Sequence, residues 1–414
     1  MINRKYVTLK NGLKLVFIND NTKHIQYAEI KIRYGGRTKK VKVNNELIVI
    51  PDGVAHLLEH TVYENTIYGN LNNFFKDNYI DSNAFTSYDD TCYYIETVFD
   101  FKEHLIELIK AVNTPVFTDE QIEHIKLPIY EEIKSVKDKK YKKFADAKIH
   151  NALLDNDFID NVGTKESIEN INKDYLMNIY NIFYQPSNQI ITISGNYDIN
   201  EITKVIEDTY NELNKEFIPF EVIKDDNSIS FRKDIVNIVD PKYNEVYNIA
   251  FKIDASKFQL EDIRKINYYL NYYLSSHFDD NSEAFKEVLD KGYSKYSFGR
   301  NVSFDFIDNV IMMDIDLETT NIKEVKKIIL DTLNKKDIDE NNFKLRHKAV
   351  VIDRIMRLDN IYKVLSEYSY NIARYDFDGI DTVEFVDELN PKECLEYINK
   401  LDFSHYCELI QTKE

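Results

Sequence analysis

Residues 51–65 read PDGVAHLLEHTVYEN, and this stretch decides how the rest of the chain is interpreted. Its pattern predicts a helix over 54–63. His56, Glu59 and His60 are spaced at i, i+3 and i+4, so a helix projects all three side chains from one side. A separate apolar stripe on the same helix can face a hydrophobic core, and it consists of Ala55, Leu58 and Val62.

Two imidazoles one helical turn apart can bind one metal ion, because adjacent turns bring their ring nitrogens together. Zn²⁺ accepts histidine nitrogen and needs a third protein ligand and an open position to be catalytic. A glutamate beside the pair is placed to take a proton from water. With nine histidines among 414 residues, H-x-x-E-H is rare by chance. The alternative is a solvated helix face that carries two neutral histidines.

The third ligand must come from another segment, and the best candidate lies in 120–136, where apolar residues recur at helical spacing. Glu131 and Glu132 are adjacent there and point about 100° apart on a helix. Glu132 falls on the apolar stripe, three positions after Ile129, whereas Glu131 falls off it. A carboxylate on a buried face is costly unless it is paired or metal-bound. We therefore expect Glu132 to be buried and to complete the metal site.

The composition is that of an acidic globular chain. With 53 Lys and Arg against 71 Asp and Glu, the formal net charge of the 414 residues is −18. Such a chain repels phosphate backbones, which argues against nucleic-acid binding. No apolar run approaches the ~20 residues that a membrane span needs. The sequence also contains neither a G-x-S-x-G nucleophile motif nor a glycine-rich phosphate loop.

The N-terminus and the cysteines indicate the compartment. Cys92, Cys394 and Cys407 are too few and too scattered for a disulfide framework, which fits a reducing compartment. Residues 1–17 have no continuous apolar core and no small-residue cleavage site, so they do not predict a signal peptide. They predict two strands joined by a hairpin turn at 11–12, where the sequence is Asn-Gly. We expect a cytoplasmic protein.

Strand groups and helix groups alternate twice along the chain. The first half predicts strands at 6–9, 14–18, 26–32, 91–99 and 189–194, and helices at 54–63, 70–76, 102–112, 120–136 and 201–213. The second half repeats this order, with strands at 230–239, 245–252, 301–306 and 310–317, and helices at 260–277, 322–334 and 340–362. This order predicts an α+β fold of two related, sandwich-like domains, each a mostly antiparallel sheet covered by helices. We place the domains at 1–214 and 229–414, with a linker at 215–228.

Several motifs in one order carry a family resemblance. They are H-L-L-E-H (56–60), N-A-F-T-S (83–87), Y-E-E-I (130–133), V-G-T-K-E-S-I (162–168) and Y-Q-P-S-N (184–188). Together they resemble the inverzincin metallopeptidases of the pitrilysin/insulinase kind, and most of all the half-length bacterial, processing-peptidase-like members.

The resemblance implies a zinc-dependent endopeptidase with one zinc ion per chain. It implies that the metal ligands are His56, His60 and Glu132, with Glu59 as the general base. By the same resemblance, Asn83, Ala84 and Phe85 lie on a strand edge that pairs with an extended peptide substrate. Strand addition of this kind uses backbone hydrogen bonds to hold the peptide and side-chain pockets to select it.

Two regions depart from the family's pattern. Many relatives carry another glutamate seven positions before the zinc-binding one, where this chain has Ile125. Because that acid supports the site and does not bind the metal, we expect its absence to tune metal affinity. Complete enzymes also bring an Arg and a Tyr, seven apart around a glycine, from the second half. If Gly292 is that glycine, the two positions here hold Val288 and Lys295.

The second departure leaves open how the chain works. In one interpretation, a homologous partner subunit supplies the Arg/Tyr pair, and this chain is the zinc-bearing subunit of a heterodimer, or otherwise part of a homodimer. In the other, the chain is a catalytically silent homologue that binds peptides or acts as a scaffold through a partner. We favour the first, because an inactive protein has no physical need for an acid that faces two histidines.

Overall fold

The computed structural model describes residues 3–137, 161–223, 231, 233–242, 244–305, 309–375 and 377–413. Their contacts divide the chain into two compact units. The first unit contains the described residues up to 223 together with the later segment 361–380, and the second contains the others. The sequence prediction placed residues 361–380 in the second domain, 229–414, whereas the contacts group this segment with the first unit. Of the predicted linker 215–228, residues 224–228 lie outside the described residues.

The first unit is built on a six-stranded sheet in the order β1-β2-β8-β3-β7-β6. Neighbouring strands are antiparallel except for the parallel pair β2 and β8, as the mostly antiparallel prediction requires. The strands are β1 Asn3–Thr8, β2 Lys14–Asn19, β3 Gln26–Ile32, β6 Asp81–Thr86, β7 Thr91–Thr97 and β8 Gln189–Gly195. A smaller sheet in the order β5-β4-β9 consists of β4 Lys40–Val43, β5 Glu46–Val49 and β9 Phe220–Val222.

One hydrophobic core joins a face of the large sheet to a set of helices. The helices are α1 Val54–Glu64, α2 Leu71–Asp77, α3 Phe101–Asn113, α4 Asp119–Lys137, α6 Lys165–Ile168, α7 Lys173–Phe183 and α8 Ile199–Leu213. Phe17 from β2, Leu58 from α1 and Tyr93 from β7 are fully buried in this core. Burial of each such side chain stabilises the fold by about 1.5–3 kcal/mol, so this core fixes how α1 and α4 lie against the sheet.

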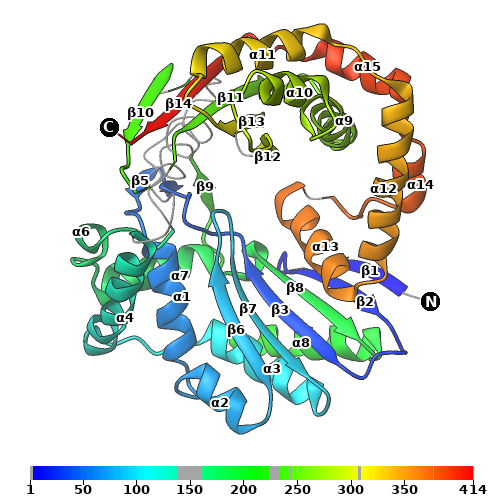
Figure 1. The fold of residues 1–414 in the computed structure, drawn as a ribbon. Helices are drawn as coiled ribbons and strands as arrows, with labels where there is room; N and C mark the ends of the chain where they lie inside the picture. Colours follow the sequence, from blue (N-terminus) through cyan, green and yellow to red (C-terminus); the bar gives the residue numbers. More distant parts are fainter. Residues whose placement is uncertain are drawn as a thin grey trace. The chain divides into compact units, whose positions relative to one another are not determined.

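Helix α13 (Ile361–Tyr375) covers the opposite face of the same sheet and contacts β8 and β2. Figure 1 shows it across the sheet from α3 and α8. Side chains alternate along a strand, so Glu96, which follows the core residue Ile95, points toward α13. There the Tyr362 hydroxyl donates a 2.7 Å hydrogen bond to Glu96.

The single helix predicted over 340–362 is wrong. Helix α12 (Glu340–Leu358) ends at Leu358, with Asp359 as its C-cap, and α13 begins at Ile361. Asp and Asn at 359–360 are weak helix formers, and the apolar face of α13 packs in the first unit, so the two helices are separate elements. The buried residues of that face include Val364, Leu365, Tyr368 and Ile372.

The second unit has a five-stranded sheet in the order β10-β14-β11-β13-β12. Its strands are β10 Ile235–Val239, β11 Val246–Asp254, β12 Gly299–Asp305, β13 Val310–Glu318 and β14 Tyr406–Thr412. Its helices are α9 Leu260–Phe278, α10 Glu283–Asp290, α11 Ile322–Lys335, α12, α14 Val383–Asp387 and α15 Pro391–Lys400. The sheet begins with a parallel pair and continues with three antiparallel pairs, the same sequence of pairings as β2-β8-β3-β7-β6. The predicted α+β fold of two related domains is therefore confirmed.

Candidate metal centre

Helix α1 holds the residues of the H-x-x-E-H motif. It begins at Val54, as the sequence predicts, directly after Gly53, whose φ of 79° is in the left-handed region. A Cβ at Gly53 would lie 2.7 Å from the carbonyl oxygen of Val162, so the close approach requires glycine here. Buried apolar residues fix the rotation of the helix about its axis, and they are Val54, Ala55, Leu57, Leu58 and Val62.

The structure brings His56, His60 and Glu132 together. Glu132 Oε2 lies 3.4 Å from His56 Nε2 and 3.9 Å from His60 Nε2. The potential ligand atoms of the three residues lie within 4.8 Å of one another, and among the described residues no other group of three His, Cys, Asp or Glu meets this criterion. Zn–N and Zn–O bonds of about 2.0–2.2 Å in tetrahedral geometry place ligand atoms roughly 3.3–3.6 Å apart. The Glu132–His56 distance lies in this range and the Glu132–His60 distance is slightly longer, so small side-chain shifts would let the three residues hold a zinc ion with a fourth position left for water or substrate.

Glu132 reaches this position from α4, which contacts α1. Its expected burial is wrong: the Glu132 side chain is 49% exposed. The buried stripe of α4 runs through Ile125, Ile129 and Ile133, and Glu132 lies at its edge, beside the histidines and open to solvent. Glu131 is also exposed and pairs with Lys134 at 3.9 Å. Proximity to the histidines, and not the cost of burial, distinguishes the two acids.

Glu59 lies in a different environment from Glu132. It is 7% exposed, and the Thr86 hydroxyl donates a 2.7 Å hydrogen bond to its Oε2 atom. Burial raises the pKa of the Glu59 carboxyl above its usual value, against the Thr86 hydrogen bond and the charge of His60, which lower it. A buried carboxylate with one fixed oxygen is suited to accept and release a proton.

Glu64 orients His60, and this contact was not among those predicted from the sequence. His60 Nδ1 lies 3.2 Å from Glu64 Oε1, so Nδ1–H donates to the carboxylate and Nε2 faces Glu132. Burial disfavours the charged imidazole, but Glu64 and the other nearby carboxylates outweigh it and raise the pKa of His60. The i, i+4 spacing of His60 and Glu64 on α1 was the signal that could have identified this contact.

Asn83, Ala84 and Phe85 lie on β6, the last strand of the six-stranded sheet, which pairs on one side with β7. Helix α1 contacts β6, and the Tyr63 hydroxyl is 2.9 Å from Ser82 Oγ. Asn83 and Phe85 are exposed, and Ala84 is half-buried. The predicted substrate-binding residues therefore share an accessible sheet edge next to the helix that bears the histidines.

Val288 and Lys295 are the two positions at which complete relatives carry an Arg and a Tyr, and neither residue is an arginine or a tyrosine here. Val288 lies on α10 and is fully buried in the core of that unit. Lys295 and Tyr296 are exposed in the segment that follows α10. Val288 thus serves packing and has no hydrogen-bond donor on its side chain.

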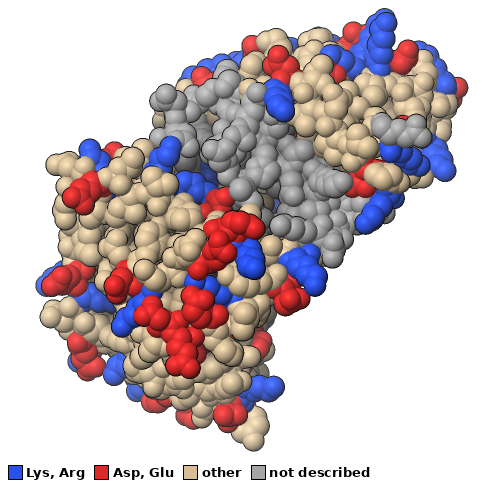
Figure 2. All heavy atoms as spheres, turned by 90° about the vertical axis from the view of Figure 1, so that its left-hand side faces the viewer, with Lys and Arg blue, Asp and Glu red and all other residues tan. Residues whose placement is uncertain are grey.

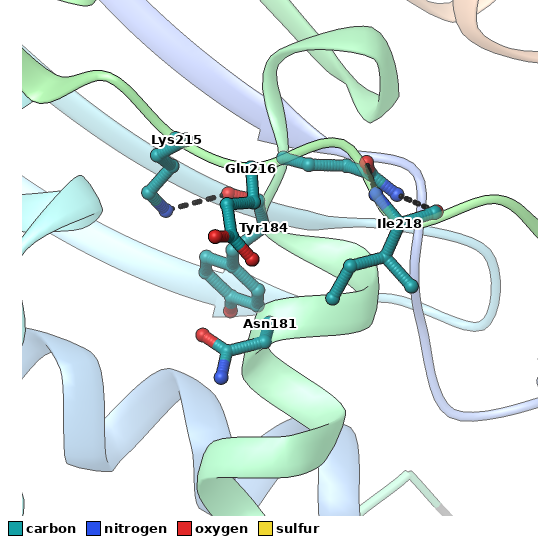
Figure 3. Close-up of a pocket in the computed structure, with 6 residues that line it drawn as sticks. Asn181, Tyr184, Lys215, Glu216 and Ile218 are labelled. Atoms are coloured by element: carbon teal, nitrogen blue, oxygen red, sulfur yellow. Dashed lines mark hydrogen bonds between the residues drawn. The ribbon is translucent and has the colours of Figure 1, made fainter.

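A separate cavity of about 210 Å³ lies at the C-terminal end of α7, and none of the predicted site residues lines it. Figure 3 shows Lys215 directed toward the Tyr184 backbone, with Glu216 and Asn181 nearby. Lys215 Nζ donates to the Tyr184 carbonyl oxygen at 2.7 Å and to the Tyr180 hydroxyl at 2.8 Å. Burial lowers the pKa of Lys215 to about 7.

Acidic side chains contribute to the surface near the metal centre. Figure 2 shows charges of both signs on one face of the molecule, with acidic side chains gathered on its lower part. The exposed acids of α4 include Glu123, Glu131 and Glu132. Exposed carboxylates such as these attract cations. Among the described residues, no helix combines the length and the apolar character that crossing a bilayer requires.

Family models and curated relatives match the chain. Residues 14–162 match the model described as insulinase (peptidase family M16), and residues 170–344 match the model described as peptidase M16 inactive domain. The "uncharacterized zinc protease YmfH" of Bacillus subtilis (strain 168) is 29% identical over 313 residues, which cover 72% of this chain and 69% of the relative.

Solved structures of M16 peptidases share the fold of this chain. A putative M16-like peptidase from Alicyclobacillus acidocaldarius has a TM-score of 0.81 at 20% identity, covering 99% of this chain and 98% of that one. Pitrilysin has a TM-score of 0.76 at 16% identity. The match covers all of this chain and 45% of the pitrilysin chain. With M16 models matching residues 14–162 and 170–344 and an M16-like fold along its length, the chain belongs to the pitrilysin/insulinase-like family of M16 peptidases.

Proposed function

We propose that this chain is a zinc-dependent endopeptidase, or the zinc-bearing subunit of one, that hydrolyses extended peptides. The observation that carries the proposal is the convergence of His56, His60 and Glu132 from two helices, with their potential ligand atoms within 4.8 Å of one another, because these are residue types that zinc binds. The relatives named zinc proteases support the choice of metal.

The proposed mechanism assigns the proton to Glu59. When bound, zinc supplies a Lewis acid that polarises a carbonyl and makes water more acidic. Glu59 takes a proton from the attacking water and passes it to the leaving amine, and the Thr86 hydroxyl holds one of its oxygens during both transfers. Glu64 keeps His60 in the tautomer whose Nε2 is free for the metal.

The proposed substrate is an extended peptide that adds as a strand to β6, on the side where no strand of the described residues pairs with it. Strand addition uses backbone groups, so it suits a sheet edge and makes few demands on sequence. Asn83, Ala84 and Phe85 would line the bound peptide, and the exposed Phe85 ring is the apolar contact among them. The acidic surface near α4 favours peptides with a positive charge through long-range attraction.

We further propose that a homologous subunit supplies the Arg/Tyr pair, in a heterodimer or otherwise in a homodimer. Val288 and Lys295 stand at the compared positions of this chain, and Val288 is buried. The competing proposal is a silent homologue that binds peptides as a scaffold. The match of residues 170–344 to a domain described as inactive is compatible with both.

Metal content separates the two proposals. Protein purified without chelator is expected to contain about one zinc ion per chain by elemental analysis, since three ligands and an open position are available. His56→Ala should lose the metal, whereas Glu131→Ala, which alters the exposed neighbour of Glu132, should retain it. Less than a tenth of an equivalent of zinc in the unmodified protein would favour the scaffold.

We place this activity in the cytoplasm, as expected from the sequence. All three cysteines are buried and none is in a disulfide, which suits a reducing compartment. Fractionation of the native cells, with the protein followed by antibody, tests this: recovery with a periplasmic marker would exclude it.

A further inference from the structure

Helix α13 forms an ion pair with the turn that joins β6 to β7. Arg374, near the end of α13, lies 2.6 Å from Asp89 Oδ2 through Nη1 and 3.8 Å from Asp90 Oδ2 through Nη2. The side chains of both aspartates are only 8% exposed, and that of Arg374 is 17% exposed. Arg37 approaches Asp89 from the other side at 3.6 Å. This is a largely desolvated charge cluster, in which the removal of one member is costly.

The turn that bears the aspartates is tightly organised. Ser87 N–H donates to the Asp90 carbonyl at 2.7 Å, and the Ser87 hydroxyl donates to the Asp90 carboxylate at 2.8 Å. The backbone N–H groups of Asp89 and Asp90 donate back to the Ser87 hydroxyl. The position of Asp90 therefore sets the position of Ser87.

Ser87 directly follows Thr86, the residue whose hydroxyl binds the Glu59 carboxylate at 2.7 Å. The Thr86 hydroxyl is also 3.4 Å from that of Thr91, which begins β7. A continuous series of contacts thus joins Arg374 on α13 to Glu59 on α1. All of it lies within the first unit, although α13 comes from the last sixth of the chain.

We propose that Arg374 is a positioning residue for the reaction: α13 holds the 87–90 turn so that Thr86 keeps the Glu59 carboxylate in place. This inference rests on the proposed function for the role of Glu59. Without the guanidinium, two adjacent buried carboxylates repel each other and the turn shifts. A displacement of about 1 Å in a reacting group can cost ~10²-fold in rate.

Kinetics of three variants test the inference. Arg374→Gln should lower kcat by about tenfold or more, with KM and zinc content unchanged, because the turn contributes no metal ligand. Arg374→Lys, which keeps the charge, should recover part of kcat. The matched control is Tyr362→Phe, which removes another contact of α13 with the sheet, to Glu96, and should leave kcat unchanged.

A double-mutant comparison shows whether Arg374 acts through Glu59. In a Glu59→Gln background, Arg374→Gln should lower kcat no further, because the group that it positions is already absent. If the two losses multiply, or if Tyr362→Phe is as damaging as Arg374→Gln, Arg374 has only a structural role and the inference is overturned.

Amide hydrogen exchange supplies a readout that does not need activity. Exchange at residues 86–91 should increase in Arg374→Gln and not in Tyr362→Phe, with global stability monitored in parallel. Unchanged protection of 86–91 in Arg374→Gln overturns the inference even if the protein is an active peptidase. If exchange at 86–91 increases in Arg374→Gln but the protein binds no zinc, then Arg374 does hold the 87–90 turn, and it is the proposed peptidase function that fails.

Discussion

The two central carboxylates differ in ways that set their proposed roles. Glu59 is buried and accepts a hydrogen bond from Thr86, whereas Glu132 is half exposed and faces two imidazoles. An exposed carboxylate beside neutral nitrogen ligands can bind a cation without a large desolvation cost. A buried one with a raised pKa is closer to the value that proton transfer near neutral pH requires.

Exchange of Glu59 for glutamine should separate metal binding from proton transfer. The Glu59→Gln protein is expected to keep its zinc, since Glu59 is not among the three converging ligands, and to lose about 10²–10⁴-fold in kcat. Glu131→Gln is the matched control, because Glu131 is exposed one residue from Glu132 and should not matter. Peptide hydrolysis at the unmodified rate by Glu59→Gln would refute the role as base.

Lys215 should be an unusually reactive amine at neutral pH. Its pKa of about 7 means that about half of the side chains are uncharged at that pH, and the side chain lines the cavity at the end of α7. Labelling by a small acylating reagent, read at the Lys215 peptide by mass spectrometry, should rise through pH 7 and level off by about pH 8–9, whereas an ordinary lysine rises toward ~10.4.

The exposed Lys134 is the reference for this measurement, since it is labelled in the same samples. Burial disfavours the charged amine in the folded state, so Lys215 destabilises the fold at pH values below the pKa of the unfolded chain. This penalty shrinks, and the free energy of unfolding increases, as the pH rises from about 7. A Lys215 labelling rate that keeps climbing up to pH 10 would contradict the lowered pKa.

At the scale of single elements, sequence periodicity located the helices and strands around the site. Helix α1 begins at the predicted residue, and α4 and β3 agree with their predictions to within one residue at each end. The contact between Arg374 and the 87–90 turn could not be predicted, because it joins segments nearly 290 residues apart through charges that resemble surface residues. The exposure of Glu132 escaped prediction since periodicity cannot locate the edge of a buried stripe.

The start of α1 depends on Gly53, and a pair of glycine variants can test this. Both Gly53 (φ +79°) and Gly69 (φ +80°) adopt the left-handed conformation, but a Cβ meets backbone within 2.7 Å at Gly53 and nothing within 4 Å at Gly69. Gly69→Ala should cost roughly 1–2 kcal/mol of conformational strain alone. Gly53→Ala should cost about 1–3 kcal/mol more through overpacking, and should weaken zinc binding by moving His56.

Urea denaturation of both variants, together with zinc titration, measures these effects. Equal shifts of the denaturation midpoint would mean that the contact between Gly53 and Val162 does not constrain the helix. In that case the histidine positions would depend on the core residues of α1 and not on its first turn.

On the scale of the whole chain, two units with the same order of strand pairings differ in chemistry. The helices of the first unit bring a metal-ligand set together, and in the described part of the second unit no comparable set occurs. The α+β class and the repeated order of elements could be predicted, because both follow from local periodicity. The grouping of residues 361–380 with the first unit could not be predicted, since it depends on the tertiary packing of α13.

The buried Val288 leads to the prediction for the complete molecule. An oxyanion that forms during peptide hydrolysis needs positioned donors, each typically worth 2.7–4 kcal/mol, or about 10²–10³ in kcat. With Val288 in the core of the second unit, this chain lacks one such donor at the compared position. We expect the purified chain alone to hydrolyse peptides at least ~10²-fold more slowly than a reconstituted complex with its homologous subunit.

The partner is sought by purifying the native protein from its own cells and identifying chains that accompany it. Adding that chain should raise kcat, and exchanging the Arg or Tyr of the partner's own motif should abolish the gain while zinc stays with His56, His60 and Glu132. Full turnover by a protein that light scattering shows to be monomeric would overturn the proposal. Activity that depends on concentration without a second sequence would identify the homodimer, in which two copies of this chain provide the donors through residues other than Val288.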